Sequence, residues 1–356
     1  MVDTWGRRVR IPRLRILLGL GVVIVLIGAC SQVSPPIAHS STAQVSTHLP
    51  KVILISVDGL NPDVIARMGE TRLPNFHRLR AEGASTHNAR TMVELTSTLP
   101  NHSSMFTGWN IGDHEVTFNR DNGATIHQSA GIQVSSIFTV AHDNGLSTAL
   151  YAGKPKFDFY DRSWNEDFAE PDVTGTDDGP DKIDDYQRAS GGVTTRDYVT
   201  KLGEEGFGIS VVHYAEVDDA GHDHGSGSPE YRGAIADVDA WIGDILNVVE
   251  ADRDLAENTV LVVTADHGTS GTSHGDPGDP DNYTILFYIW GTGIPHADLY
   301  TLAEGSRTDP GTRQPLNGEA EQPIRNGDVA NLILDLIHLG PVPGSTINTE
   351  QDLLGG

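Results

Sequence analysis

The sequence predicts an α/β fold in which a mainly parallel sheet is sandwiched between helices. Short apolar runs alternate with helical patterns along most of its 356 residues. The runs are almost continuously apolar, which is typical of strands that a parallel sheet buries on both faces. Two of the runs also lead into an aspartate, Asp58 and Asp266, at the strand ends where such sheets bind ligands.

The expected strands are five apolar runs, at residues 52–57, 147–152, 208–213, 260–264 and 284–290. Helical patterns separate them, at residues 75–82, 102–107, 135–142, 195–204, 230–250 and 327–337. Strands joined through helices form the crossover units of a sheet that is covered on both faces. Residues 156–192 interrupt the alternation, because Asp, Gly, Pro and aromatic residues crowd there. We expect this segment to form a small cap over the site; an irregular surface loop is the alternative.

The first 29 residues have the features of an export signal. Five arginines precede a short apolar stretch, residues 16–29, which is too short to span a bilayer comfortably. The stretch ends just before Cys30, the only cysteine in the chain. This ending resembles a bacterial lipoprotein signal, which implies cleavage before Cys30, a lipid on that cysteine and a place in the cell envelope outside the cytoplasm. The alternatives are an uncleaved anchor and an ordinary secretory signal that is cut near Ala29.

Residues 30–49 are rich in Ser, Thr, Pro and Ala and predict a flexible tether, after which the folded domain occupies residues 50–356. The chain has 49 acidic and 24 basic residues, and its formal net charge is −25. This acidity argues against a basic groove for nucleic acid and is most simply explained by solubility.

Metal-ligand residue types gather near the ends of the predicted strands. Asp58 follows residues 52–57, and Asp266 with its neighbour His267 follows residues 260–264. Asp218 and His222 are four residues apart, a spacing that fits two ligands on one turn. Carboxylates and imidazoles of this kind can build a hydrolytic site with two metal ions.

Other acidic and histidine residues near these motifs have weaker support. His274 lies in a loop rich in Gly, Ser and Thr, where a surface histidine is the alternative to a ligand. We expect the remaining candidates to be solvated, supporting or purely structural: Asp219, Asp223, His224, His102, His114 and His213.

Thr98 opens the segment Thr98-Leu99-Pro100-Asn101-His102. Proline suits the first turn of a helix, and the start of that helix offers free N–H groups to an anion. Thr98 can be a simple helix cap, and the two roles are compatible because a nucleophile at a helix N-terminus can use the same geometry.

Taken together and in this order, the motifs resemble the alkaline phosphatase superfamily, and most closely its type I phosphodiesterase/nucleotide pyrophosphatase branch. The resemblance runs from about Lys51 to the C-terminus. It implies a phosphothreonine intermediate on Thr98, with the phosphoryl oxygens held by Asn119 and the Leu99 N–H. It also implies two divalent metal ions, with zinc the expected ion. The first would be held by Asp58, Thr98, Asp266 and His267, and the second by Asp218, His222 and His274.

The sequence departs from this branch at two places. Leu99 replaces the aromatic residue that stacks on a nucleobase in nucleotide pyrophosphatases, and Gly112-Asp113-His114-Glu115 replaces a Pro-x-x-His-Gly pattern. Lys154-Pro155-Lys156 is similar to the paired lysines that hold a carboxylate in phosphonoacetate hydrolases; two exposed loop lysines are the alternative. Sulfatases of the superfamily carry Cys or Ser and an Arg where this chain has Thr98 and His102.

These features predict a two-metal phosphoryl hydrolase, of the phosphodiesterase/nucleotide pyrophosphatase type, that acts on a small phosphate- or phosphonate-containing substrate. We expect Leu99, Lys154 and Lys156 to contact the substrate. One alternative is a phosphonate or phosphomonoester hydrolase that uses the two lysines. A non-catalytic surface lipoprotein is the other.

Overall fold

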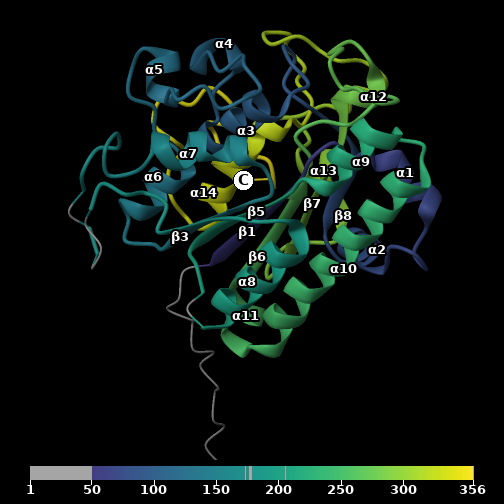
Figure 1. The fold of residues 1–356 in the computed structure, drawn as a ribbon, viewed down its shortest axis with the longest axis horizontal. Helices are drawn as coiled ribbons and strands as arrows, with labels where there is room; N and C mark the ends of the chain where they lie inside the picture. Colours follow the sequence, from purple (N-terminus) through teal and green to yellow (C-terminus); the bar gives the residue numbers. More distant parts are fainter. Residues whose placement is uncertain (1–49, 173, 176–178, 205, 356) are drawn as a thin grey trace, which may run out of the picture. The chain divides into compact units, whose positions relative to one another are not determined.

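The strands described by the computed structural model form one sheet of eight, in the order β4-β3-β5-β1-β6-β7-β2-β8 (Figure 1). The model describes residues 50–172, 174–175, 179–204 and 206–355. The strands are β1 Lys51–Val57, β2 Ala84–Arg90, β3 Thr148–Ala152, β4 Asp185–Arg188, β5 Ile209–Tyr214, β6 Thr259–Thr264, β7 Thr284–Gly291 and β8 Ala297–Asp298. Neighbours pair in parallel except where β7 meets β6 and β2. The prediction of a mainly parallel sheet is therefore confirmed.

Helices cover both faces of this sheet, as predicted. In Figure 1, α8, α10 and α11 lie on one side of the strands, while α3, α6 and α14 lie on the other. The helices are α1 Pro62–Met68, α2 Pro74–Glu82, α3 Thr98–Thr107, α4 Ile111–His114, α5 Ile126–Ala130, α6 Ile137–His142, α7 Asp158–Ser163, α8 Gly191–Glu204, α9 Glu216–His224, α10 Pro229–Ala251, α11 Arg253–Asn258, α12 Pro280–Tyr283, α13 Leu299–Leu302 and α14 Val329–Leu336, with the 3₁₀ turns η1 Pro155–Phe157 and η2 Asn326–Asp328.

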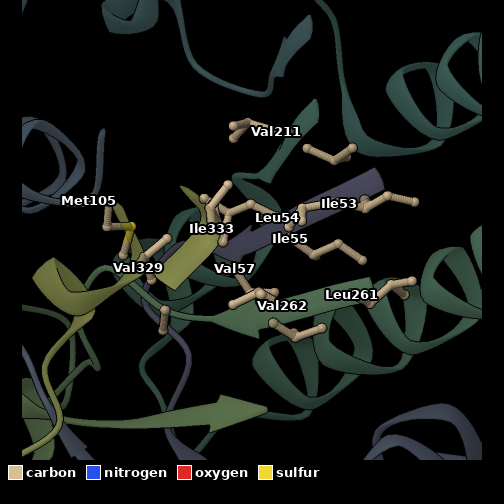
Figure 2. Close-up of a cluster of buried hydrophobic side chains, with 14 of the residues drawn as sticks. Ile53, Leu54, Ile55, Val57, Met105, Val211, Leu261, Val262, Val329 and Ile333 are labelled. Carbon is tan, nitrogen blue, oxygen red and sulfur yellow. The ribbon is translucent and has the colours of Figure 1, made fainter. Parts of the chain in front are cut away.

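Strand β1 is central because its side chains are apolar on both faces. Its run from Val52 to Ile55 is fully buried between β5 and β6. Figure 2 shows the β1 side chains among those of β5 and β6, together with Met105 of α3 and Ile333 of α14. Burying each such side chain stabilises the fold by roughly 1.5–3 kcal/mol. The strand that leads into Asp58 is thus held rigidly from both sides.

Three strands were not predicted, because their sequences are short or polar. β2 reads Ala-Ser-Thr-His-Asn-Ala-Arg, and its pairing with β7 overrides the weak strand preference of that sequence. β8 has only two residues. β4 lies within residues 156–192 and pairs in parallel with β3, from Ala149 opposite Asp185 to Ala152 opposite Arg188. The prediction of a cap is therefore wrong for residues 185–188, which form an edge of the sheet.

The predicted signal at residues 1–29, the tether at residues 30–49 and the lipid site at Cys30 lie outside the described residues. Within the described part of the chain, no helix is both long and apolar enough to cross a membrane.

Candidate metal centre and active site

Three neighbouring strands deliver the predicted carboxylates to one edge of the sheet. Asp58 follows β1, Asp218 lies in α9 just after β5, and Asp266 follows β6 by two residues. Gly59 allows the first two segments to approach closely. Its φ is +72°, and a Cβ atom built there would lie 2.9 Å from Asp218. A larger residue at this turn would therefore push the two carboxylates apart.

Thr98 is the first residue of α3, and its hydroxyl donates to Asp58 Oδ2 at 3.5 Å. His102, one turn later, holds this end of the helix against β1. Its Nδ1 donates to the Thr98 carbonyl at 2.9 Å, and its Nε2 accepts from the Ser56 hydroxyl at 2.8 Å. The buried imidazole therefore fixes the turn that carries the candidate nucleophile.

A first group of unpaired acceptors lies beside Thr98. His267 Nε2 is 3.4 Å from Asp58 Oδ1 and 3.3 Å from Asp266 Oδ2. His267 Nδ1 donates to the Gly268 carbonyl at 2.9 Å, so Nε2 presents a lone pair. None of these three buried atoms has a hydrogen-bond partner among the described residues. Buried acceptors that face one another without a donor are costly, and a cation between them removes that cost.

A second group has the same character. His222 Nε2 and His274 Nε2 face each other at 3.1 Å, although the Nδ1 of each ring already donates to a backbone carbonyl, of Thr272 and Thr96 respectively. Asp218 Oδ1 lies 3.7 Å from His274 Nε2 and also lacks a hydrogen-bond partner among the described residues. One atom from each of Asp218, His222 and His274 lies within 4.8 Å of the others. Both groups therefore fit divalent metal ions.

Burial and crowding set the charges of these side chains. Burial would raise the pKa of Asp58, but Lys154 and the neighbouring histidines outweigh it and hold that pKa well below its usual value. Burial, with the Asp58 and Asp218 charges, raises the pKa of Asp266 well above its usual value. Burial and His274 lower the pKa of His267 to about 3, so its imidazole is neutral at physiological pH, as a metal ligand must be.

Lys154 reaches into the carboxylates. Its Nζ lies 2.7 Å from Asp58 Oδ2, 2.5 Å from Asp218 Oδ2 and 3.7 Å from Asp219 Oδ1. Burial alone would lower the pKa of this ammonium, but Asp58 and Asp218 raise it above its usual value. Lys154 is therefore charged and engaged within the protein, unlike an exposed loop lysine.

Lys156, two residues later, lies at the nucleophile. Its Nζ is 3.1 Å from Asn119 Oδ1 and 3.4 Å from Thr98 Oγ1. The same Asn119 oxygen accepts the Leu99 N–H at 3.1 Å. The structure thus brings Asn119, Lys156 and the Leu99 N–H together around Thr98. The Leu99 side chain is fully buried within the core cluster, and its contact with the substrate stays a prediction.

Sequence reasoning treated His213 as structural and missed its contact with the site. Its Nδ1 accepts the Gly153 N–H at 3.2 Å, which leaves Nε2–H to donate to Asp58 Oδ2 at 3.2 Å. Its position at the end of a strand next to β1 was the available signal. Asn326 was also missed; its amide donates to the Asp266 carbonyl at 2.9 Å and to Asn101 at 3.0 Å.

The other acidic and histidine candidates lie away from the unpaired atoms. Asp219, Asp223 and His224 are exposed on α9. His114 is buried between the Ser104 hydroxyl and the Val116 N–H, where it supports the backbone after α3.

Solved structures of other proteins share this fold. Murine ectonucleotide pyrophosphatase/phosphodiesterase 5 matches 86% of this chain and 100% of its own, with a TM-score of 0.58 and 17% identity. A 2-O GAG sulfatase matches 87% of this chain and 75% of its own, with a TM-score of 0.58 and 13% identity. The fold is that of the alkaline phosphatase superfamily.

Within this superfamily, the model of the type I phosphodiesterase / nucleotide pyrophosphatase family matches residues 52–285, and the chain belongs to that family. Human ectonucleotide pyrophosphatase/phosphodiesterase family member 5 is 24% identical over 260 residues, covering 69% of this chain and 52% of that protein. Human GPI ethanolamine phosphate transferase 2, catalytic subunit, is 26% identical over 243 residues, covering 67% of this chain and 23% of that protein. The chain thus spans about half or less of the length of these relatives.

Proposed function

We propose that the protein is a two-metal phosphoryl hydrolase, of the phosphodiesterase/nucleotide pyrophosphatase type, that acts through a phosphothreonine at Thr98. Two observations carry this proposal. The first is the group of unpaired atoms of Asp58, Asp266 and His267 beside Thr98, and the second is the pair of facing Nε2 atoms of His222 and His274 next to the unpaired Asp218 Oδ1. Family membership supports the same class of reaction.

Each group of acceptors would hold one divalent ion. Asp58, Asp266, His267 and the Thr98 oxygen would hold the first, and Asp218, His222 and His274 the second. Zinc is the ion that we expect, because it binds Asp and His donors in small sets of this kind. When bound, such ions supply Lewis acidity for the attacking and leaving oxygens.

The chain's own residues perform the remaining tasks. The Thr98 hydroxyl donates to Asp58 Oδ2, which orients it. Asp58 is a weak base because its pKa is lowered, so water would take the proton as Thr98 attacks. Thr98 Oγ then bonds to phosphorus while the bond from phosphorus to the leaving oxygen breaks. Asn119, Lys156 and the Leu99 N–H hold the non-bridging oxygens. Water afterwards cleaves the phosphothreonine and restores the hydroxyl.

The relatives favour a substrate with a phosphodiester or pyrophosphate bond. A match from Xenopus laevis, 23% identical over 247 residues, is named a bis(5'-adenosyl)-triphosphatase. The buried Leu99 side chain offers no stacking surface for a base, so nucleotide recognition would need other residues.

A second candidate is a phosphomonoester or phosphonate hydrolase. The position of Lys156 favours it, because an ammonium beside Asn119 and Thr98 would suit a phosphoryl group that carries an extra negative charge. Both groups consist of residue types that bind metal ions. They therefore give no support to a purely non-catalytic role.

The deciding experiment compares zinc-dependent hydrolysis of a matched aryl phosphodiester and aryl phosphomonoester by the wild type, Thr98→Ala and Thr98→Ser. We expect diester preference in the wild type, no turnover in Thr98→Ala and partial turnover in Thr98→Ser, which keeps a hydroxyl. Monoester preference would favour the second candidate. Full activity of Thr98→Ala would refute the threonine mechanism.

A further inference from the structure

The Lys154 ammonium lies between two carboxylates that belong to different metal positions. It is 2.7 Å from Asp58 Oδ2 and 2.5 Å from Asp218 Oδ2, and its side chain is 11% exposed. We propose that Lys154 is an internal cation that holds these carboxylates together in the metal-free protein, and that metal binding displaces it. The inference rests on the metal centre of the proposed function. It adds that the Lys154 ammonium competes with the metal ions for Asp58 and Asp218.

Charge balance explains why the metal-free site needs a cation. Asp58, Asp218 and Asp266 are buried within one cluster. Among the described residues, Lys154 is the lysine that bonds two of them, and a buried charge pair is stable only when each charge is matched. Two divalent ions would supply four positive charges to the same cluster. The ammonium then becomes surplus and is repelled by the ions that share its carboxylates.

The backbone at Lys154 is fixed, so only the side chain can leave. The Gly153 N–H is bonded to His213 Nδ1, and a Cβ at Gly153 would lie 2.9 Å from Ala215. On the other side, the Lys154 carbonyl accepts the Phe157 N–H at 3.1 Å. The Phe157 ring is fully buried and packs 4.2 Å from the His213 ring. Displacement is therefore a rotation of the lysine side chain about an anchored backbone.

Asp219 gives the displaced ammonium a place to go. Its Oδ1 already lies 3.7 Å from Lys154 Nζ, and its side chain is 64% exposed, compared with 3% for Asp218. A short rotation toward solvent replaces a buried partner by an exposed one. Metal loading thus places a lysine at the edge of the site, where an anionic substrate would meet it.

The test measures the Zn²⁺ affinity of the metal-free full chain by competition with a chromogenic chelator, in the wild type, Lys154→Met and Lys156→Met. We expect Lys154→Met to bind Zn²⁺ about tenfold more tightly, which corresponds to roughly 1.4 kcal/mol of lost competition. We also expect it to lower the Tm of the metal-free protein more than that of the zinc-loaded protein. Lys156→Met is the matched control, because it removes the same charge only two residues away. The Lys156 ammonium contacts Asn119 and Thr98 rather than Asp58 and Asp218.

Each outcome decides between specific ideas. Equal tightening in both variants would show a general charge effect and overturn the competition. Weaker zinc binding by Lys154→Met would show that the lysine only positions the carboxylates, and would also overturn it. Absence of zinc binding in the wild type would defeat the proposed function itself. Lys154→Gln replaces the Met variant if that protein does not fold, and Lys154→Arg should retain wild-type affinity.

Discussion

The Nε2 atoms of His222 and His274 face each other 3.1 Å apart while both Nδ1 atoms donate to backbone carbonyls. Two lone pairs directed at one another repel, so this arrangement is stable only with a positive charge shared between the rings. The contact therefore supports the proposed second metal position with geometry as well as residue type.

We expect His222→Ala to lower the bound zinc from about two ions to about one per chain. The ion that remains would be the one beside Asp58, because that group keeps all its donors. Elemental analysis of the purified protein gives the ratio. His224→Ala is the control, since His224 is exposed on the same helix. Two bound ions in His222→Ala would remove this histidine from the centre.

His213→Ala should weaken zinc binding by about 10- to 100-fold, because His213 orients Asp58 by donating to its Oδ2. Chelator competition measures this loss. The control is His114→Ala, which also removes a buried imidazole but lies between Ser104 and Val116. If the two variants lose zinc affinity equally, the effect of His213 is one of general stability.

Gly59→Ala should reduce turnover by about 100-fold or more, because the added Cβ would displace Asp218. Gly69→Ala provides a matched comparison. Gly69 has a φ of +74°, close to that of Gly59, but a Cβ there meets nothing within 4 Å. Both variants should lose roughly 1–3 kcal/mol of stability from backbone strain. Steady-state kinetics should nevertheless show near wild-type turnover in Gly69→Ala alone; similar turnover in both variants would contradict the steric argument.

Asp161 of α7 should make stability depend on pH. Burial and the nearby Asp181 and Asp158 raise its pKa to about 6. A carboxyl whose pKa is higher in the folded state favours folding below about pH 4, and that contribution is lost as the pH rises through 6. After allowance for solvent screening, ionised Asp161 costs about 1 kcal/mol at pH 7.5.

Asp161→Asn should therefore raise the Tm by about 2–4 °C at pH 7.5 and leave it nearly unchanged at pH 4. Thermal unfolding at the two pH values tests this. Asp158→Asn is the comparison, because Asp158 bonds Arg188 and the Tyr186 hydroxyl at 2.7 Å, so its loss should not raise the Tm. An equal gain at both pH values would exclude ionisation as the cause.

Cys30→Ser should release the protein from membranes when the full chain is produced in bacteria. This follows from the proposed lipid on Cys30, and fractionation with mass spectrometry of the N-terminus measures it. Retention of the variant in the membrane fraction would favour an uncleaved anchor instead.

The sequence predicted the central strands of the fold better than it predicted the periphery. Asp58 and Asp266 could be placed because long apolar runs precede them, and long-range packing then brings their strands together. β4 and β8 carry no such pattern, since β4 is polar and β8 has two residues. The burial of Leu99 was not predicted because its residue type does not reveal that α3 turns its side chain into the core. His213 was missed because its contact with Asp58 joins residues 155 positions apart.

The two candidate metal positions differ in their access to solvent. The side chains of Asp58, Asp266 and His267 are fully buried, whereas that of His222 is 45% exposed. The two ions should therefore exchange with solvent at different rates, and a chelator in the medium should remove the ion at His222 first. When zinc is scarce, the protein would keep the ion at Asp58 and lack the ion at His222. The zinc concentration, rather than the substrate concentration, would then set the fraction of protein that is active.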